Sequence, residues 1–194
     1  MGERMAETIT IVVLAGAIRE ERKSIHAARY IADYARQLPD VMVEFVDPQE
    51  VDLQPLPGDD HETRDQRYHD ITARADAFYI VTPEYNHSYP GSLKRVLDSE
   101  FENYYHKPVA IAGASSGRWG GVRACEALLP VMHTLGMPVI KTELYFPRVQ
   151  EIFDATGTIR GDQEASYREN LKRAFDELLL FARAFKKVRQ GDIL

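Results

Sequence analysis

Short apolar runs alternate with longer amphipathic stretches along the whole chain. The apolar runs are rich in β-branched residues and lie between turn residues, whereas the amphipathic stretches carry apolar residues at helical spacing. The predicted strands are residues 8–14, 41–46, 77–82, 108–114 and 138–144. The predicted helices are residues 24–38, 62–75, 92–101, 119–135 and 163–189. This alternation predicts an α/β fold in which a five-stranded, parallel, doubly wound sheet lies between two helical layers.

Several single residues set the expected ends of these elements. Ser24 is a candidate N-cap for the first helix, and Pro83 is expected to stop the third strand. Pro130 is expected to kink or break the helix over residues 119–135. The turn-rich stretch 47–60 is expected to form a surface loop. Because no repeat or linker interrupts the pattern, residues 1–194 are expected to form one domain.

Composition narrows the class of protein without changing the fold prediction. Hydrophobic residues make up 44% of the chain and charged residues 28%, as in ordinary globular proteins. The net charge of −6 argues against nucleic acid or an anionic membrane surface as a partner. The polar N-terminus carries no signal peptide pattern, and no apolar run is long enough to span a membrane, so we expect a cytoplasmic protein.

Cysteine and histidine usage gives no indication of a metal site. Cys125 is the sole cysteine, so no intrachain disulfide can form, and we expect its thiol to be buried as a small hydrophobe. The six histidines show no tight ligand spacing beyond pairs. We therefore expect no bound metal.

The first of three unusual loops, residues 15–24, joins the first strand to the first helix. In open α/β sheets, ligands bind at the carboxyl ends of the strands near the switch point, so the loops after strands one, three and four are informative. Arg19, Arg22, Lys23 and Ser24 stand where a helix N-terminus attracts phosphate. The alternative is a solvated charged turn with Ser24 as a simple cap. The chain lacks the dinucleotide and P-loop glycine motifs here, so a bound phosphate would be that of a mononucleotide.

The other two unusual loops are residues 82–94 and 114–121. The earlier loop is stiff, and the later loop lets its backbone come close to a ligand. Prolines make the earlier loop stiff, and Tyr85 and Asn86 offer a flat ring and hydrogen bonds to a planar heterocycle. In the later loop, three glycines within five residues allow the backbone to approach a ligand. Each loop alone has a simpler interpretation. Residues 82–94 could be a surface turn with exposed aromatics, and residues 114–121 could be a plain flexible turn. Three such loops at converging strand ends favour a ligand site.

The run from Pro83 to Lys94, PEYNHSYPGSLK, is close to the P-E-Y-N-x-S-x-P-G-x-L-K signature of one family. Through residues 8 to 150 the chain resembles the NADPH-dependent FMN reductases, a flavodoxin-like group that includes quinone, azo-dye and chromate reductases. The first loop is similar to the family's G-S-x-R…S element, except that Ala17 replaces the usual serine. The third loop is similar to the family's S-G-x-x-G-G segment, beginning at Ser116.

The resemblance implies a flavodoxin-like fold and a set of FMN-binding residues. It implies that the first loop holds the phosphate, that the second lines the isoalloxazine ring, and that the third flanks the ring or ribityl chain. These residues are Gly16, Arg19 and Ser24 in the first loop, Pro83, Glu84, Tyr85 and Asn86 in the second, and Ser116, Gly117 and Gly120 in the third. Ala17 removes one hydroxyl donor, so FMN affinity is either weakened or restored by Arg19 and backbone amides. The family usually forms homodimers or homotetramers.

The resemblance implies an oxidoreductase that passes electrons from NADPH or NADH through FMN to a small acceptor. The acceptor would be a flavin, a quinone, an azo compound or a metal oxyanion. Because the cofactor carries the chemistry, no catalytic residue is predicted. Arg118 is a candidate for the nicotinamide's phosphate and His87 for protonating the acceptor, although a solvated arginine and an idle loop histidine are the simpler interpretations.

Two alternatives remain open from the sequence. A non-enzymatic FMN electron carrier would normally have a phosphate loop rich in Ser and Thr, whereas this loop is basic. A flavin-free regulatory domain is favoured only by Ala17.

Overall fold

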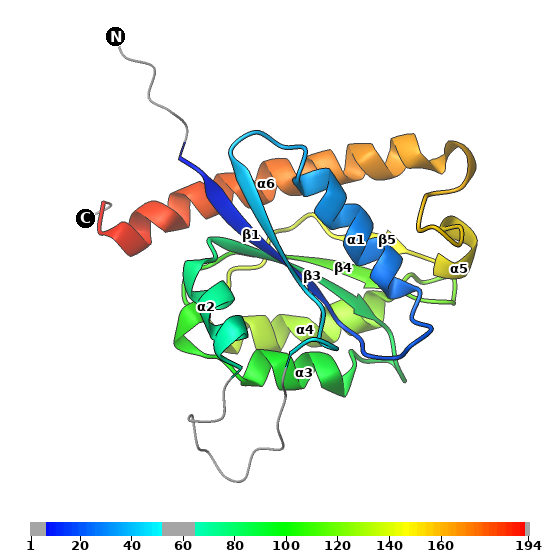
Figure 1. The fold of residues 1–194 in the computed structure, drawn as a ribbon, viewed down its shortest axis with the longest axis horizontal. Helices are drawn as coiled ribbons and strands as arrows, with labels where there is room; N and C mark the ends of the chain where they lie inside the picture. The colour runs from blue at the N-terminus through cyan, green and yellow to red at the C-terminus, as the bar shows by residue number, and fades with distance from the viewer. Residues whose placement is uncertain (1–6, 52–64, 193–194) are drawn as a thin grey trace.

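The strands form one parallel sheet in the order expected for a doubly wound domain. The computed structural model describes residues 7–51 and 65–192. Its strands are β1 (Ile9–Ala15), β2 (Val41–Val46), β3 (Ala77–Pro83), β4 (Val109–Ala114) and β5 (Leu144–Phe146). The order across the sheet is β2-β1-β3-β4-β5, and every neighbouring pair is parallel (Figure 1). The predicted flavodoxin-like, five-stranded doubly wound sheet is therefore confirmed.

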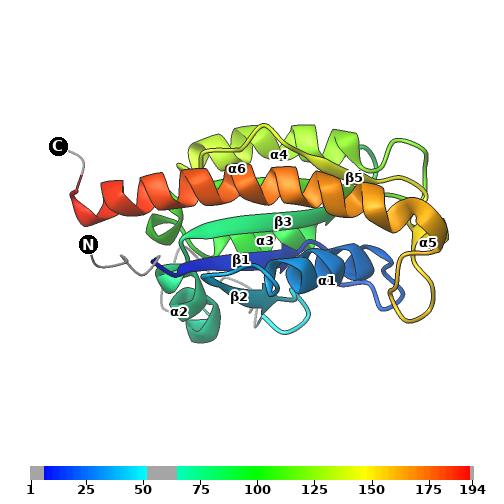
Figure 2. The ribbon, with the colours of Figure 1, turned by 90° about the horizontal axis from the view of Figure 1, so that it is seen from above.

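Helices cover both faces of this sheet (Figures 1 and 2). The helices on one face are α1 (Ser24–Ala35), the single turn α5 (Val149–Ile152) and α6 (Glu164–Gln190). Those on the other face are α2 (Gln66–Arg74), α3 (Gly91–Asp98) and α4 (Val122–Thr134). Short 3-10 turns occupy Glu102–Tyr104 (η2) and Gly161–Gln163 (η3).

The core is divided into two halves by the central strands. Ile11 and Val13 of β1 pack into the half beneath α1 and α6, whereas Val12 and Leu14 pack into the half beneath α2, α3 and α4. All four side chains are fully buried. A strand that is covered on both faces needs apolar residues at every position, which explains the uninterrupted apolar run in the sequence.

The fifth strand differs from its prediction over residues 138–144. The ladder with β4 is confined to Leu144–Phe146, and Val139 makes only an isolated bridge to Val109. Between them, the backbone N–H groups of Lys141 and Thr142 donate to the carboxylate of Glu177 at 2.9 and 3.0 Å. A side chain of α6 therefore takes two backbone donors at the point where the pairing with β4 is interrupted.

Two prolines and one helix cap also behave differently from the expectations. Pro83 is the last residue of β3 and pairs with Ala114, so it does not stop the strand one residue earlier. Pro130 lies inside α4, which continues through it to Thr134. The N-cap position of α1 is Lys23, with Ser24 as the first helical residue and no side-chain cap bond. The N-cap prediction for Ser24 is therefore wrong, because the chain enters the helix one residue earlier.

The second helix is shorter than its prediction over residues 62–75. It begins after Asp65, whose side chain accepts a hydrogen bond from the Tyr68 N–H at 2.8 Å. Residues 62–64 of that prediction, and residues 52–60 of the predicted surface loop, lie outside the described residues.

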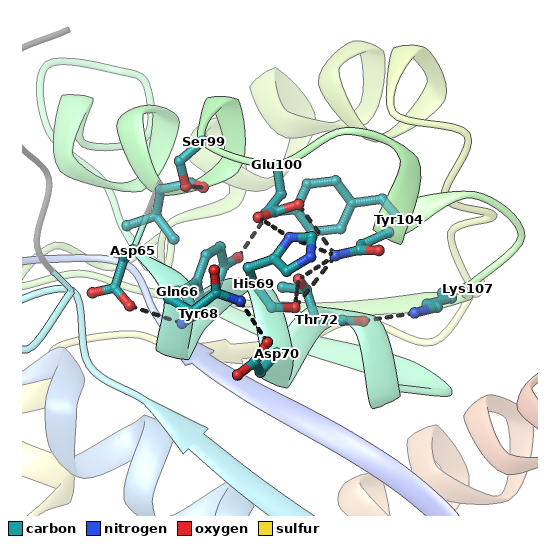
Figure 3. Close-up of polar contacts among 12 residues, drawn as sticks. Asp65, Gln66, Tyr68, His69, Asp70, Thr72, Ser99, Glu100, Tyr104 and Lys107 are labelled. Atoms are coloured by element: carbon teal, nitrogen blue, oxygen red, sulfur yellow. Dashed lines mark hydrogen bonds and ion pairs between the residues drawn. The ribbon is translucent and has the colours of Figure 1, made fainter. Parts of the chain in front are cut away.

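A polar network at the amino end of β4 joins α2 to η2 (Figure 3). The hydroxyls of Tyr68 and Tyr104 are hydrogen-bonded at 2.7 Å, and His69 Nδ1 lies 2.8 Å from the buried carboxylate of Glu100. Lys107 Nζ donates to the carbonyl of Thr72 at 2.6 Å, close to the end of α2. The network fixes α2 at the edge of the sheet opposite to the ends that carry the three loops.

Lys107 is expected to make the free energy of unfolding depend on pH in the alkaline range. Burial lowers the pKa of its ammonium group from the usual 10.5 to about 8. Between these values the unfolded chain holds a proton that the folded chain has lost, so this group's contribution to stability rises with pH. We expect the wild type to gain stability relative to Lys107→Met between roughly pH 8 and pH 10.5 in urea unfolding. A stability difference that stays constant over that interval would contradict the lowered pKa.

Candidate functional site

The three loops singled out in the sequence meet at a cavity of about 250 Å³ at the carboxyl edge of the sheet. It lies beside the point where the strand order reverses, between the ends of β1 and β3. The lining residues are Arg22, Lys23, Ser24, Pro83, Glu84, Tyr85, Ala114, Ser115, Ser116, Val149 and Gln150.

Half of the predicted FMN-binding residues line this cavity. These are Ser24, Pro83, Glu84, Tyr85 and Ser116. The remaining predicted residues belong to the same loops but are not part of the lining, namely Gly16, Arg19, Asn86, Gly117 and Gly120. The structure thus brings the three loops together as predicted. Only half of the predicted residues face the cavity, and the others lie elsewhere in the same loops.

The second loop is held rigid by a tight turn. The backbones of Tyr85 and Ser88 exchange hydrogen bonds at 2.8 and 3.1 Å. The two residues between them, Asn86 and His87, have φ values of 50° and 67°. Two successive positive φ values are those of a type I′ turn, where asparagine is among the favoured residues. Asn86 therefore shapes the loop that presents Tyr85 to the cavity.

Glu84 contributes a buried carboxylate to the cavity wall. Its Oε1 accepts a hydrogen bond from Arg123 of α4 at 2.9 Å, and its side chain is only 10% exposed. Within the described part of the chain, its Oε2 is buried without a hydrogen-bond partner. A buried carboxylate oxygen without a donor is costly, so this position favours a ligand that brings an N–H or O–H group.

The two arginines of the first loop have different surroundings. The Arg19 guanidinium lies over the ring of Tyr85, 4.1 Å from its centroid, and so joins the first loop to the second. Arg22 lines the cavity and is ion-paired with Asp47, at the end of β2. From the sequence, Arg22 is recognisable only as one of the charged residues of the first loop. The pairing with a residue 25 positions away has no signal in the sequence.

Ala17 does not face the cavity. It is fully buried and is absent from the lining, whereas Ser24 at the start of α1 lies in it. The groups at this end of the cavity that could receive an anion are the N-terminus of α1 and the cationic side chains of Arg22 and Lys23 beside it.

Glycines bring the backbone segments around the cavity into close contact. A Cβ at Gly16 would lie 2.8 Å from the Val81 carbonyl oxygen, so the glycine allows the ends of β1 and β3 to meet. A Cβ at Gly120, where φ is +65°, would lie 2.9 Å from Tyr145 Cβ. The Gly117 carbonyl accepts a hydrogen bond from the Arg148 N–H at 3.0 Å. In this structure Gly117 and Gly120 hold the third loop against β5 and the segment that follows it.

That segment supplies lining residues that the sequence did not reveal. Val149 and Gln150 belong to α5, a single turn too short to show a helical pattern. The Val149 N–H donates to the Ser115 carbonyl at 3.0 Å, which attaches this turn to the third loop.

The remaining candidate groups lie outside the lining. His87 is exposed, and the Arg118 guanidinium lies 4.6 Å from the ring centroid of the exposed Trp119. Cys125 is fully buried as predicted, and burial raises the pKa of its thiol. Across residues 7–51 and 65–192, no group of three or more His, Cys, Asp and Glu side chains is arranged to hold a metal ion.

The residues around the cavity fit FMN. Arg22, Lys23 and the start of α1 provide positive potential for a phosphate at one end. Pro83 and Tyr85 provide a rigid apolar wall, and the unpartnered oxygen of Glu84 can accept a hydrogen bond from a heterocycle.

Comparison with known proteins agrees with this arrangement. Residues 9–151 match the sequence model of a family described as NADPH-dependent FMN reductase. An NAD(P)H-dependent FMN reductase of Pseudomonas aeruginosa is 33% identical over 126 residues, which are 62% of this chain and 66% of that protein. A quinone reductase of Pseudomonas putida is 30% identical over 166 residues, 80% of this chain and 87% of that protein.

Solved structures share the fold. The flavoenzyme FerB of Paracoccus denitrificans, an NAD(P)H:(acceptor) oxidoreductase, superposes with a TM-score of 0.73 at 23% identity. The superposition covers 90% of this chain and 99% of that chain. Among the helices of the described residues, none combines the length and apolarity needed to cross a bilayer.

Proposed function

Because the chain belongs to the NADPH-dependent FMN reductase family, we propose that its cavity at the carboxyl edge of the sheet is the FMN site of an NAD(P)H-dependent oxidoreductase. The observation that carries the proposal is the meeting of the three family-like loops around one cavity. Electrons pass from the reduced nicotinamide through FMN to a small acceptor. A quinone is the acceptor favoured by the similarity to the quinone reductase of Pseudomonas putida.

Bound FMN supplies the redox chemistry, by accepting a hydride and returning its electrons to an acceptor. The chain's own residues bind and orient. Ser24 and the start of α1 receive the phosphate, while Pro83 and Tyr85 place the ring. The free oxygen of Glu84 accepts a hydrogen bond from the ring edge, and Arg123 holds that carboxylate in position.

We assign no proton transfer to a residue beside the ring, and Glu84, the carboxylate in the cavity wall, acts only as a hydrogen-bond acceptor in this proposal. His87 points from the turn into solvent and is not part of the lining. Since one cavity serves both nicotinamide and acceptor, we expect the first to leave before the second enters, which gives ping-pong kinetics. We also propose a homodimer or homotetramer, which is supported by the exposed apolar side chains of Trp119 and Leu180.

The test is a spectrum of the purified protein after addition of FMN and removal of the excess, followed by anaerobic NADPH or NADH. We expect retained oxidised-flavin absorbance that bleaches rapidly with a reduced nicotinamide and returns on addition of a quinone. Retained flavin that neither nicotinamide bleaches would instead indicate an electron carrier. Failure to retain FMN at any concentration would overturn the flavin site.

A charge variant tests whether the flavin binds in this cavity. Ser24→Asp puts a carboxylate into the first turn of α1, where it repels the phosphate, while a negative charge in that turn is favourable to the helix dipole. The matched control is Ser166→Asp, which adds the same charge to an exposed position in the first turns of α6. We expect Ser24→Asp to lose FMN and the control to keep it. Equal retention by both variants would place the flavin elsewhere.

A further inference from the structure

A second cavity, of about 290 Å³, lies between α1, the loop that follows α5 and the start of α6. These elements cover the same face of the sheet (Figures 1 and 2). The lining residues from α1 share one face of that helix, and they are His26, Arg29, Tyr30, Asp33, Tyr34 and Gln37. The second cavity shares no lining residue with the cavity formed by the three loops, so it is a separate place in the molecule.

Two tyrosine rings in the lining of the second cavity are held from behind. Tyr34 stacks on the buried Phe175 with ring centroids 5.4 Å apart, and the Arg168 guanidinium lies 5.3 Å from the Tyr34 centroid. Tyr30 meets the buried Phe153 edge-on, with centroids 6.1 Å apart. Both tyrosines are only partly buried, so the lining offers a fixed aromatic surface against which a planar ring can pack.

The wall opposite to α1 is a closed loop. The carboxylate of Asp154 accepts hydrogen bonds from the N–H groups of Thr156 and Thr158 at 2.8 and 3.0 Å. Phe153 and Ile159 form an antiparallel bridge at the base of the loop. Because these bonds are already made, a ligand that enters the cavity has little of this wall to order.

The charges around the second cavity leave one arginine unpaired. Asp33 is ion-paired with Arg36 at 2.6 Å, and Glu164 lies 4.0 Å from Arg168. Within residues 7–51 and 65–192, Arg29 makes no hydrogen bond or ion pair. The guanidinium of Arg29 therefore keeps its full set of donors for a ligand.

His26 does not add to this positive charge. Burial, followed by the charges of Lys23 and Arg29, lowers the pKa of His26 below its usual 6.5, so the imidazole is neutral at pH 7. The second cavity thus presents one uncompensated positive charge beside an aromatic surface.

We propose that the second cavity is a binding site for a small aromatic monoanion, a planar ring that bears a carboxylate. Arg29 receives the carboxylate through two parallel N–H donors, and the ring packs against Tyr30, Tyr34 and the Arg168 guanidinium. One carboxylate balances one unpaired arginine, which favours it over a dianionic phosphate ester. The site does not depend on the proposed function of the cavity formed by the three loops.

The experiment follows the backbone amide NMR signals of the full-length protein, in the presence of FMN, during titration with benzoate. We expect saturable shifts at Gly157 and Thr158, which line the second cavity, with a dissociation constant of about 1 mM. Cyclohexanecarboxylate carries the charge without the aromatic face and should bind about 2- to 10-fold more weakly. Benzyl alcohol carries the ring without the charge and should bind at least about 10-fold more weakly.

A pair of arginine variants tests the proposed carboxylate contact. Arg29→Gln removes the contact and should raise the benzoate dissociation constant at least about 10-fold. The matched control is Arg183→Gln, which removes an exposed arginine of α6 outside the lining and should leave the constant unchanged. Both positions are exposed, and the dispersion of the amide signals shows that each variant is folded.

The inference is overturned if benzoate causes no saturable shift at Gly157 and Thr158, if Arg29→Gln binds benzoate as tightly as the wild type, or if benzyl alcohol binds as tightly as benzoate. Shifts confined to Ser24, Tyr85 and Ser116 would place benzoate in the cavity formed by the three loops and would overturn it as well. Retention of FMN and its bleaching by NADPH are measured separately, so a failure of either proposal is distinguishable from a failure of the other.

Discussion

Gly121→Ala is expected to be among the most damaging single substitutions, with a loss of about 3 kcal/mol in the free energy of unfolding. Gly121 occupies the N-cap position of α4 with φ at +91°, in the left-handed region that favours glycine. A Cβ there would lie 2.7 Å from the Ala114 backbone nitrogen and 3.0 Å from Gly113 Cα. The obstacle is the backbone of β4, which cannot move aside as a flexible side chain would.

The same substitution should weaken FMN binding, because Ala114 is part of the cavity wall. Urea unfolding and flavin titration measure the two effects. The matched control is Gly161→Ala, where φ is +68° but no atom lies within 4 Å of the added Cβ. We expect the control to cost about 1 kcal/mol, the conformational cost alone, and to leave flavin affinity unchanged. Equal losses in the two variants would show that the collision with β4 is relieved without cost.

The central part of the fold was predictable because burial on both faces leaves a direct mark on the sequence. The apolar run of β1 and the β2 boundaries agree with the structure to within one residue. The fifth strand was not predictable at that level, because its pairing is decided by Glu177, which lies on α6 far along the chain. A local sequence pattern indicates which residues are buried. It does not indicate which distant side chain will accept a hydrogen bond from a given backbone N–H.

In the candidate site, too, features that are local in sequence could be predicted, and contacts between distant residues could not. The run from Pro83 to Tyr85 was found because turn chemistry and a family signature are local in sequence. The partners of the two arginines were not found, because Arg22 meets Asp47 and Arg19 meets Tyr85 only after the sheet has formed. A sequence can indicate that a loop is cationic, and the fold decides which cation faces the cavity.

Asp76 is the buried anion that fixes the C-terminal half of α6 to the sheet. The residue is 5% exposed and precedes β3 by one position. Its Oδ1 accepts a hydrogen bond from Arg189 at 2.7 Å, and its Oδ2 accepts from Lys186 at 2.9 Å and from the Thr10 N–H at 3.0 Å. Both cations come from α6, and the N–H comes from β1. One carboxylate therefore holds together elements from the two ends of the chain.

Asp76→Ala is expected to lower the free energy of unfolding by about 3 kcal/mol. It leaves the Thr10 N–H without its acceptor, and it removes the buried counter-ion of Lys186 and Arg189, which keep the carbonyls of Thr8 and His106 as acceptors. The matched control is Asp176→Ala, which removes an ion pair on the same helix whose side chains are 63% and 67% exposed. An exposed pair of this kind should change stability by less than about 1 kcal/mol.

Unfolding by urea, with circular dichroism as the probe, compares the two variants. A loss from Asp76→Ala no greater than that of the control would show that solvent replaces the buried carboxylate without cost. Asp76 lies at the amino ends of the strands, opposite to the cavity. Under conditions where Asp76→Ala is still folded, its dissociation constant for FMN should therefore equal that of the wild type. A weakened flavin site in that variant would mean that the position of α6 is coupled to the loops across the sheet.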